Sequence, residues 1–508
     1  MWSHIIHNFD HQSNLHVLEP SCGDGAFLNP PLAQNIKQHV FIDAVEKNGR
    51  ALTHAMSRVQ EDENIKINFV QDDFLKVKLV EGYDLVIGNP PYIGRKLLTE
   101  QQISICAKIY ADSGLSNKSI RNIWPAFVIK SSQLLSKNGV LAFVLPGELL
   151  QVDYASEIRA YLTSRFSAIE ILTFKELIFP ALGQDVAVVF AYKGSEFSGL
   201  RFAQVRGVES LDSSVIFSSR HIAGKTKWSN LVLSDQDRVF LTKVASKFDV
   251  VSHYCVSTPG IVTGVNDFFI VNKEIVERYG LQAYCKPILQ KSSVVGNVVA
   301  FSKAQMKGLQ NSSEPSFFID LGHVPQKKLP KGVQSYLRFG KKKKYHTGYK
   351  CSNRKPWYNI PVVWAPVGVI FKRSHLYPKL IRNDSNALFT DSAYRIVPGK
   401  EYGIESIIYS FYNSLTLILC ELNGRYYGGG VLELTPSEFK GLPLPYKVIS
   451  KKEFSQFRSK FKNAANIENI LAENDNDLLL RLEITLSDIK RLQKIRKKLL
   501  SYRLRNSK

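Results

Sequence analysis

The stretch LVIGNPPYIGR, residues 85–95, runs from a hydrophobic strand into a corner with two consecutive prolines. Neither proline has a backbone N–H to donate and both fix φ, so a strand ladder or a helix has to end there. An amide, Asn89, stands before the prolines, and a phenol, Tyr92, stands after them. This order predicts a buried strand that ends in a rigid corner flanked by two polar side chains.

Short apolar runs alternate with helix-compatible stretches on both sides of this corner, through the first 200 residues. Such alternation is typical of β-α units on a mostly parallel sheet with helices on both faces. The strand-like runs are His16–Leu18, Val40–Val45, Ile67–Val70, Tyr83–Ile87, Val140–Leu145, Ala168–Leu172 and Val186–Tyr192. The helix-compatible stretches include Asn48–Val59, Ile123–Leu135 and Ser156–Phe166. We therefore predict an α/β domain whose ligand lies outside the carboxyl ends of the strands.

Three earlier strand ends carry side chains suited to a nucleoside. Gly23 and Gly25 follow the first strand, where glycine lets the backbone turn tightly and approach a ligand. Glu46 follows the second, at a place where an acidic side chain commonly binds ribose hydroxyls. Asp73 and Phe74 follow the third and offer a hydrogen-bond acceptor beside an aromatic surface. Because the chain has no G-x-x-x-x-G-K-[ST] phosphate loop, these residues predict a nucleoside-type pocket without one.

The Asn89 corner suits transfer of a group to an amine. Asn89 offers a carbonyl oxygen and Pro90 a backbone C=O whose direction Pro91 fixes, so two acceptors can hold both hydrogens of an exocyclic amino group. Such binding favours a more tetrahedral nitrogen and stabilises the positive charge that develops during its attack. Tyr92 presents a flat face on which a base can stack. Direct displacement on an activated methyl group then requires neither a general base nor a covalent intermediate.

Residues 17–195 resemble the γ class of N6-adenine-specific DNA methyltransferases of bacterial restriction–modification systems. Glu19–Leu28, EPSCGDGAFL, is similar to the first motif of this family, Glu46 to the second and Asp73–Leu75 to the third. Asn89–Tyr92, NPPY, is similar to the catalytic fourth motif. The resemblance implies a class I S-adenosylmethionine-dependent methyltransferase fold, with a Rossmann-like, mostly parallel seven-stranded sheet, followed by a mixed α+β DNA-recognition domain.

The resemblance also implies the roles of individual residues. Glu19, Glu46 and Asp73 are expected to contact the amino-acid end, the ribose and the adenine of S-adenosylmethionine, with Phe74 against the adenine. The full set of implied cofactor-binding residues is Glu19, Ser21, Gly23, Gly25, Glu46, Asp73 and Phe74. The implied catalytic residues are Asn89, Pro90, Pro91 and Tyr92. The segment LIFPALGQDVAVVFAY is similar to the one that ends in an aromatic residue closing on the flipped base, so Tyr192 and Tyr92 are expected to sandwich the target adenine; Phe190 lies on the same strand face as Tyr192.

The charge of the chain is uneven. Residues 1–200 contain 18 Lys and Arg against 21 Asp and Glu, whereas the remaining residues contain 49 against 24. Phosphate contacts supply most of the non-specific affinity for nucleic acid, so the basic part suggests a polyanionic partner. The cofactor motifs precede the catalytic motif with no room for an inserted domain, so the recognition domain is expected to come last. We predict a catalytic domain at 1–200, a target-recognition domain at 205–450 and a basic helical segment at 451–508.

Three later segments resemble the opening, middle and close of the γ-class recognition domain: 258–271, 353–361 and 425–445. Basic and aromatic residues interleave around the second of them, a composition that suits phosphates and splayed bases. The expected DNA-binding residues are Lys341, Lys342, Lys343, Lys344, Arg354 and Lys355. Trp357 and Trp364 are expected to pack in the core. Leucine and isoleucine at helical spacing near the end of the chain predict an amphipathic helix that packs on the domain or touches the DNA backbone.

The resemblance and the basic later part of the chain together predict a monomeric, cytoplasmic enzyme. It is expected to be sequence-specific and to transfer a methyl group from S-adenosylmethionine to N6 of a flipped adenine in double-stranded DNA, with a restriction endonuclease as a separate functional partner. No segment is apolar enough for a membrane span, and no secretory signal is present at the N-terminus. The six cysteines form no C-x-x-C pair, so neither a disulfide framework nor a zinc site is expected.

Several alternatives share the chemistry. Methylation of N4-cytosine, of rRNA or of a protein glutamine uses related motifs, although N4-cytosine enzymes more usually have serine in place of Asn89. A cytosine-C5 enzyme is disfavoured because no Pro-Cys pair occurs. A fused methylase–nuclease lacks a convincing Pro-Asp…Glu-x-Lys set, and the intact NPPY motif disfavours a non-catalytic DNA-binding subunit.

The γ class usually carries a Thr-Pro pair on a helix before its first motif. The 16 residues before Val17 contain no proline, although Trp2–Phe9 is helix-compatible. We therefore expect that the numbered start is late or that the chain is truncated there, which would open the cofactor pocket on that side.

Overall fold

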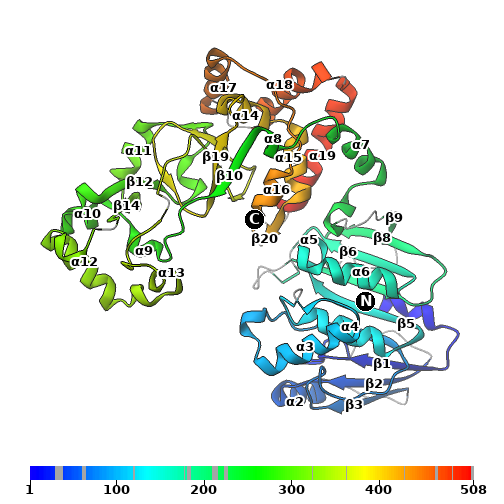
Figure 1. Ribbon diagram of the computed structural model, residues 1–508. Coiled ribbons are helices and arrows are strands. Elements are labelled where there is room, and N and C mark those ends of the chain that lie inside the picture. Colours follow the sequence, from blue (N-terminus) through cyan, green and yellow to red (C-terminus); the bar gives the residue numbers. More distant parts are fainter. Residues whose placement is uncertain are drawn as a thin grey trace. The chain divides into compact units, whose positions relative to one another are not determined.

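The chain divides into two compact units (Figure 1). Unit 1 comprises Met1–Arg238, Tyr427–Gly429 and Leu504–Lys508, and unit 2 comprises Val239–Tyr426 and Gly430–Arg503. The computed structural model describes residues 1–28, 38–59, 64–117, 120–176, 178–179, 185–208, 215–221, 227–322, 324–361, 363–427, 429–463, 467–482 and 484–504.

Unit 1 is built on one nine-stranded sheet with the order β3-β2-β1-β4-β5-β7-β6-β8-β9. Its strands are β1 Asn14–Glu19, β2 His39–Val45, β3 Ile65–Val70, β4 Tyr83–Gly88, β5 Leu135–Pro146, β6 Ala168–Phe174, β7 Val186–Tyr192, β8 Gly199–Val205 and β9 Ser218–Arg220. The first five strands pair in parallel, and β7 runs antiparallel between β5 and β6. The seven strands expected from the sequence are therefore confirmed, and β8 and β9 extend the sheet at one edge (Figure 1).

Helices cover this sheet, and α4 packs against β5 while α6 packs against β6. The helices of unit 1 are α1 Trp2–Ile5, α2 Gly49–Arg58, α3 Glu100–Asp112, α4 Trp124–Leu134, α5 Glu148–Gln151, α6 Ser156–Arg165 and the start of α7 Asp235–Ala245. The side chain of Asn48 caps α2, and Thr99 and Gln102 form a capping box on α3, so the first backbone N–H groups of both helices have partners.

One hydrophobic cluster of unit 1 includes residues of the sheet and of the N-terminal helices. The helix expected at Trp2–Phe9 is present as α1 followed by a 3-10 helix, Ile6–Phe9. Trp2 and Ile5 are buried in the same cluster as the inward side chains of β1, β2 and β4, and Trp2 Nε1 donates a hydrogen bond of 2.9 Å to Phe27 O. Helix α1 thus packs in the hydrophobic core of unit 1.

Unit 2 contains three smaller sheets and many short helices, as expected for a mixed α+β domain. The sheet orders are β10-β19-β15-β17-β13, β11-β14-β12-β18 and β16-β21-β20. The strands are β10 Cys255–Pro259, β11 Ile270–Val271, β12 Cys285–Leu289, β13 Ala300–Phe301, β14 Phe317–Ile319, β15 Gly368–Phe371, β16 Arg373–Ser374, β17 Leu380–Asn383, β18 Leu388–Phe389, β19 Ala393–Pro398, β20 Arg425–Tyr427 and β21 Val431–Glu433. The helices are α8 Val251–Tyr254, α9 Asn266–Phe269, α10 Lys273–Tyr279, α11 Lys303–Gln310, α12 Lys331–Lys342, α13 Tyr349–Ser352, α14 Ile404–Phe411, α15 Ser414–Asn423, α16 Pro436–Lys440, α17 Lys451–Asn463, α18 Ile467–Leu479 and α19 Leu486–Leu504.

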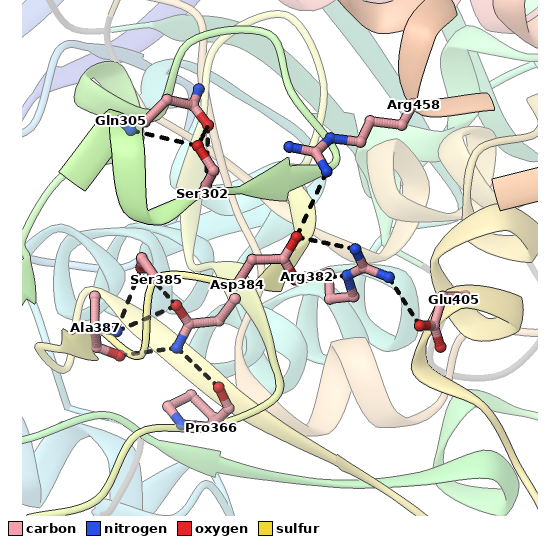
Figure 2. Close-up of polar contacts among 10 residues, drawn as sticks. Ser302, Gln305, Pro366, Arg382, Asp384, Ser385, Ala387, Glu405 and Arg458 are labelled. Carbon is pink, nitrogen blue, oxygen red and sulfur yellow. Dashed lines mark hydrogen bonds and ion pairs between the residues drawn. The ribbon is translucent and has the colours of Figure 1, made fainter. Parts of the chain in front are cut away.

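A polar cluster at the end of β17 ties this strand to two helices (Figure 2). Arg382 holds both carboxylate oxygens of Asp384, at 2.7 and 2.9 Å, and donates to Glu405 of α14 at 2.8 Å. Arg458 of α17 lies 3.6 Å from the same Asp384 carboxylate. The bidentate pairing fixes the direction of the guanidinium group, so the cluster orients α14 and α17 on the sheet.

Helix α19 confirms the amphipathic helix expected near the end of the chain. Its buried apolar residues recur every three or four positions and pack on unit 2: Ile489, Leu492, Ile495, Leu499 and Tyr502. Arg503 is also buried and pairs with Glu421 of α15 at 2.7 Å. Among the described residues no helix has the length and hydropathy needed to cross a bilayer, and no group of His, Cys, Asp and Glu is arranged to hold a metal ion.

Candidate active site

A cavity of about 590 Å³ lies at the carboxyl ends of β1, β2, β3 and β4 in unit 1. Residues from the loops after these four strands form one wall, and α3 and α4 complete it. The lining residues are Pro20, Ser21, Glu46, Lys47, Asn48, Asp72, Asp73, Phe74, Asn89, Pro91, Ile93, Gln102, Ile123 and Phe127. The four strand ends singled out in the sequence therefore meet at one cavity, because parallel strands end at the same edge of a sheet.

The turn after β1 depends on two glycines. Gly23 has a φ of +54° and Gly25 a φ of +86°, which is the left-handed region that side chains disfavour. A Cβ on Gly25 would lie 3.4 Å from the Cβ of Ala55 in α2, whereas a Cβ on Gly23 would meet nothing within 4 Å. The turn at Gly23 is thus open to a ligand, and Gly25 lets α2 approach closely.

Two backbone N–H groups hold the Glu46 carboxylate. Gly23 N donates to Oε2 at 3.0 Å and Asn48 N donates to Oε1 at 2.7 Å. Each carboxylate oxygen keeps free lone pairs after one bond, so Glu46 can still accept hydrogen bonds from a ligand in the cavity.

Glu19 lies behind the cavity, at the end of β1, with 1% of its surface exposed. Its Oε2 atom has no hydrogen-bond partner among the described residues. Burial raises its pKa well above the ordinary value of a carboxyl group, and the nearby carboxylates Asp24 and Glu46 raise it further. A buried carboxylate is stabilised by a paired cation, so this site favours a positively charged ligand group.

The loop after β3 places Asp73 and Phe74 at the cavity. Asp73 Oδ1 accepts a hydrogen bond of 3.1 Å from Leu75 N, and Oδ2 lies 3.1 Å from Lys47 Nζ. Phe74 is 2% exposed, and its ring centroid lies 5.2 Å from that of Phe127. The two phenylalanines form an apolar wall next to an acceptor that faces Lys47.

The Asn89 corner directly follows β4. The Tyr92 hydroxyl lies within hydrogen-bond distance of Asn89 Oδ1, at 2.8 Å, and of Val144 O, at 2.9 Å. Ser21 Oγ donates to Asn89 O at 3.2 Å, which joins the loop after β1 to this corner. Burial raises the pKa of Tyr92, so its hydroxyl stays protonated and acts as a donor. The described geometry thus holds the Asn89 side chain next to the cavity.

The structure brings most of the predicted site residues together. Those that line the cavity are Ser21, Glu46, Asp73, Phe74, Asn89 and Pro91. Those that adjoin it through the bonds above or through the chain are Glu19, Gly23, Gly25, Pro90 and Tyr92. The sequence interpretation missed Lys47, Asn48, Asp72, Ile93, Gln102, Ile123 and Phe127. Ile123 and Phe127 are four positions apart on a predicted helix, a spacing that indicates that they share one face.

Tyr192 does not join this site, so its predicted stacking on the target base requires correction. β7 runs antiparallel to β5, and the register pairs Tyr192 with Val140 at the opposite end of the sheet from the cavity. Tyr192 is 3% exposed, and its hydroxyl donates to Glu170 at 3.0 Å. The start of β7, where Val186 pairs with Pro146, is the end that lies at the same edge as the Asn89 corner. Of the segment that leads into β7, residues 177 and 180–184 lie outside the described residues.

Unit 2 carries a strongly basic segment. Residues 321–360 contain 11 Lys and Arg and no Asp or Glu. Lys341–Lys344 close α12 with exposed side chains, and Lys355 is also exposed. The guanidinium group of Arg354 instead donates to two carbonyls, Val262 O at 2.8 Å and Thr263 O at 2.6 Å, and so holds a loop that follows β10.

The two tryptophans behave differently. Trp357 packs on the core cluster around Phe268, as expected. Trp364 is 37% exposed, and the guanidinium carbon of Arg395 lies 4.4 Å from its ring centroid, so the expected core position was wrong for this residue. Arg395 comes from β19, far along the chain, and the sequence shows no sign of this pairing.

Two protein families match the chain. "Type II methyltransferase M.Eco57I, C-terminal domain" matches residues 225–479, and "Eco57I restriction-modification methylase" matches residues 26–179. The chain is 23% identical to the type II methyltransferase M.AccI of Acinetobacter calcoaceticus, in an alignment that covers 93% of this chain and 88% of that protein. It is 30% identical to the type II methyltransferase M.TthHB8I of Thermus thermophilus over 35% of this chain and 40% of that protein.

One solved structure shares the fold over most of the chain. The type IIL restriction-modification enzyme MmeI, determined in complex with DNA, matches with a TM-score of 0.54 at 12% identity. The match covers 96% of this chain and 69% of that one.

Proposed function

The chain belongs to the family of Eco57I restriction–modification methylases and is a DNA methyltransferase of the class I fold, and on this premise we propose that it methylates N6 of adenine with S-adenosylmethionine. The observation that carries the proposal is the junction of the Asn89 corner with the acidic strand ends at one cavity. Such a cavity can hold a nucleoside-bearing donor and an amine side by side.

The residues of the cavity fit S-adenosylmethionine. The buried carboxyl group of Glu19, whose Oε2 atom has no hydrogen-bond partner among the described residues, suits the ammonium group of its amino-acid end. The Glu46 carboxylate is positioned to accept from ribose hydroxyls, and Asp73 with Phe74 provides an acceptor and a flat apolar surface for the adenine. When bound, the cofactor supplies a methyl group on a positively charged sulfur, which makes displacement by a weak nucleophile feasible.

Asn89 and Pro90 act on the acceptor amine. Asn89 Oδ1 and Pro90 O accept its two hydrogens and stabilise the charge that develops on the nitrogen. The Tyr92 hydroxyl lies near Asn89 Oδ1, but Val144 O is a second acceptor for the same hydrogen at 2.9 Å. When Asn89 Oδ1 accepts a hydrogen bond from the substrate, the Tyr92 hydroxyl can donate to Val144 O instead and does not lose its partner.

An adenine inside a duplex cannot reach this cavity, so the proposal includes base flipping. The Tyr92 ring is half-buried and packs on the core cluster, which leaves part of its surface for the flipped base. For the second stacking position we propose Phe179 in place of Tyr192. Phe179 precedes β7, whose start lies at the site edge, and it packs on the same cluster as Tyr92.

Unit 2 is proposed to bind the duplex, mainly through the exposed lysines Lys341–Lys344 and Lys355. Their charge is not balanced by any acidic residue in 321–360, a composition suited to phosphate contacts. We further propose that the protein acts as a monomer and that the matching restriction endonuclease is a separate chain.

Sequencing that detects modified bases tests the proposal directly. DNA from cells that express the chain is expected to carry N6-methyladenine at every copy of one short sequence, and DNA from cells that express the Asn89→Ala variant is expected to carry none. N4-methylcytosine at a fixed sequence would overturn the choice of adenine, and unmodified DNA with a folded protein that binds no S-adenosylmethionine would overturn the whole proposal.

A further inference from the structure

Lys130 of α4 reaches across to the loop after β3. Its Nζ donates to Phe74 O at 2.5 Å and to Val77 O at 2.7 Å. The same ammonium lies 4.8 Å from the centroid of the Phe74 ring. The side chain is partly buried, and burial lowers its pKa while the carboxylates Asp73 and Asp72 favour the charged form. An ammonium group has three donors and no acceptor, so it can bond both carbonyls at once.

The loop that Lys130 holds is a tight turn built on Asp73. Asp73 O accepts hydrogen bonds from Lys76 N at 2.7 Å and from Val77 N at 3.0 Å. Asp73 Oδ1 accepts from Leu75 N, which leaves the carbonyls of Phe74 and Val77 directed outward toward α4. Lys130 therefore joins the two ends of the turn to a rigid helix.

Helix α4 also forms the opposite wall of the cavity. Ile123 and Phe127 line it, and Phe127 precedes Lys130 by one helical turn. The ring of Phe127 packs on that of Phe74, and Lys130 of the same helix bonds the backbone carbonyl of Phe74. One helix thus fixes both the aromatic wall and the position of the loop that carries Asp73.

We propose that Lys130 is a positioning residue for cofactor binding, which acts through the Asp73–Phe74 loop and sets the width of the cavity at its adenine end. This rests on the function proposed above. Lys130 does not line the cavity, so its effect passes through Phe74 and Asp73. Loss of the ammonium group is expected to weaken cofactor binding and to leave the transfer step at saturating cofactor nearly unchanged.

The test compares Lys130→Met with Lys130→Arg in the full-length protein. Methionine keeps much of the apolar stem and removes the donors, whereas arginine keeps the charge and several donors. Calorimetric titration with S-adenosylhomocysteine is expected to show binding weakened about tenfold or more in Lys130→Met, because two charge-assisted hydrogen bonds are lost, and partly restored in Lys130→Arg. Steady-state methylation is expected to show a raised KM for S-adenosylmethionine, with kcat within about twofold of the wild type.

Lys193→Met is the matched control. Lys193 is another half-buried lysine of unit 1 and donates to Leu135 O at 2.7 Å, but it lies after β7, at the end of the sheet away from the cavity. This variant is expected to bind the cofactor as the wild type does. Equal weakening in Lys193→Met and Lys130→Met, or unchanged binding in Lys130→Met, would overturn the proposal.

Amide hydrogen exchange of residues 73–77 in the ligand-free protein gives a readout that requires neither cofactor nor activity. Exchange in this loop is expected to be faster in Lys130→Met than in the wild type and unaltered in Lys193→Met. If Lys130→Met does not fold, Lys130→Gln, which retains an N–H donor group, is expected to show intermediate exchange, and wild-type exchange in that variant would count against the proposal. Failure of the wild type to bind any adenosyl ligand would instead refute the proposed function.

Discussion

At the scale of single residues, the chemistry of the site depends on which polar atoms already have a hydrogen-bond partner in the ligand-free protein. Asn89 Oδ1 and Val144 O compete for one phenolic hydrogen, whereas the Glu19 carboxylate oxygen Oε2 has no partner among the described residues. The first arrangement leaves an acceptor that can exchange partners, and the second leaves a buried carboxyl group that gains a favourable partner when a cationic ligand group binds and the proton leaves.

Substitutions of Asn89 and Tyr92 separate the hydrogen-bond acceptor of the corner from its stacking surface. Asn89→Ala is expected to lower kcat for DNA methylation by about a hundredfold to a thousandfold, because an oxygen that stabilises the developing charge is removed. Tyr92→Phe keeps the ring and frees Asn89 Oδ1, so activity is expected to stay within about tenfold of the wild type, whereas Tyr92→Ala removes the stacking surface and most of the activity. Cofactor affinity, measured by calorimetry, is expected to be unchanged in all three. A wild-type rate for Asn89→Ala would show that the acceptor argument is mistaken.

The raised pKa of Glu19 gives cofactor binding a pH dependence. Burial and the carboxylates Asp24 and Glu46 keep this group protonated above the pH at which an ordinary carboxyl of pKa 4.5 ionises. A bound ammonium group requires the carboxylate form, so binding releases a proton and affinity is expected to rise with pH, by up to about tenfold per pH unit, until the pH passes the raised pKa. Titration of S-adenosylhomocysteine at several pH values measures this slope.

In Glu19→Gln the slope is expected to disappear and the affinity to fall. Glu157→Gln removes a carboxylate from α6, where it accepts a hydrogen bond from Ser116 N, and serves as the control with a wild-type slope. A slope that persists in Glu19→Gln would assign the proton to another group.

At the scale of elements, the direction of β7 decides which aromatic residue can reach the target base. Because β7 is antiparallel, its first residue and not its last lies at the edge where β4 ends. The four parallel strands β1 to β4 bring their carboxyl ends to that edge, and β7 brings its amino end.

The strand direction leads to a prediction for Phe179. Phe179→Ala is expected to weaken DNA methylation about tenfold to a hundredfold, because a stacking surface worth roughly 1–3 kcal/mol for the flipped base is lost. Tyr192→Phe removes a hydroxyl bonded to Glu170 in the core, and is expected to lower stability by about 1 kcal/mol without changing kcat. Fluorescence of a 2-aminopurine placed at the target position, together with thermal unfolding, measures the two effects. If Tyr192→Phe lost turnover and Phe179→Ala did not, the expectation that Tyr192 stacks on the target base would be favoured again.

At the scale of the whole molecule, charge and chemistry are separated along the chain. Unit 1 holds the acidic cavity, and the segment 321–360 of unit 2 holds 11 basic residues without an acidic one. An acidic cavity favours a cationic ligand and a basic segment favours a polyanion, so each unit carries the charge that suits its own proposed ligand.

Salt dependence tests the role of the basic surface. Replacing Lys341, Lys342, Lys343 and Lys344 together by alanine is expected to weaken duplex binding and to reduce the slope of log K against log salt by about 3 to 4, since each phosphate contact contributes about 0.9. Fluorescence anisotropy of labelled DNA at several salt concentrations measures the slope. The four exposed lysines of α19, Lys490, Lys494, Lys497 and Lys498, provide a comparison set of equal size whose replacement is expected to change the slope less. If both sets of lysine substitutions reduced the salt slope equally, Lys341–Lys344 would have no special role in DNA binding.

The sequence by itself determined the local features of this protein. Apolar runs with helical stretches between them predicted the seven strands of the catalytic sheet and the amphipathic helix α19, because the side-chain period of an element is a local property. It also placed Glu46, Asp73 and Asn89 at one edge, since parallel strands joined by helices all end on the same side.

Only the tertiary structure decided what depends on long-range pairing. Because β7 pairs antiparallel with β5, Tyr192 lies at the end of the sheet away from the site. No local pattern in the sequence indicates this direction or register. Arg354 was expected on the DNA surface, but its guanidinium is bonded to carbonyls about 90 positions earlier in the chain. The bonds from Lys130 of α4 to Phe74 O and Val77 O also join segments 53 to 56 positions apart, and no local pattern indicates them. Net charge and side-chain periodicity can be read from the sequence. The hydrogen-bond partner of a polar side chain depends on tertiary folding, which brings distant segments into contact.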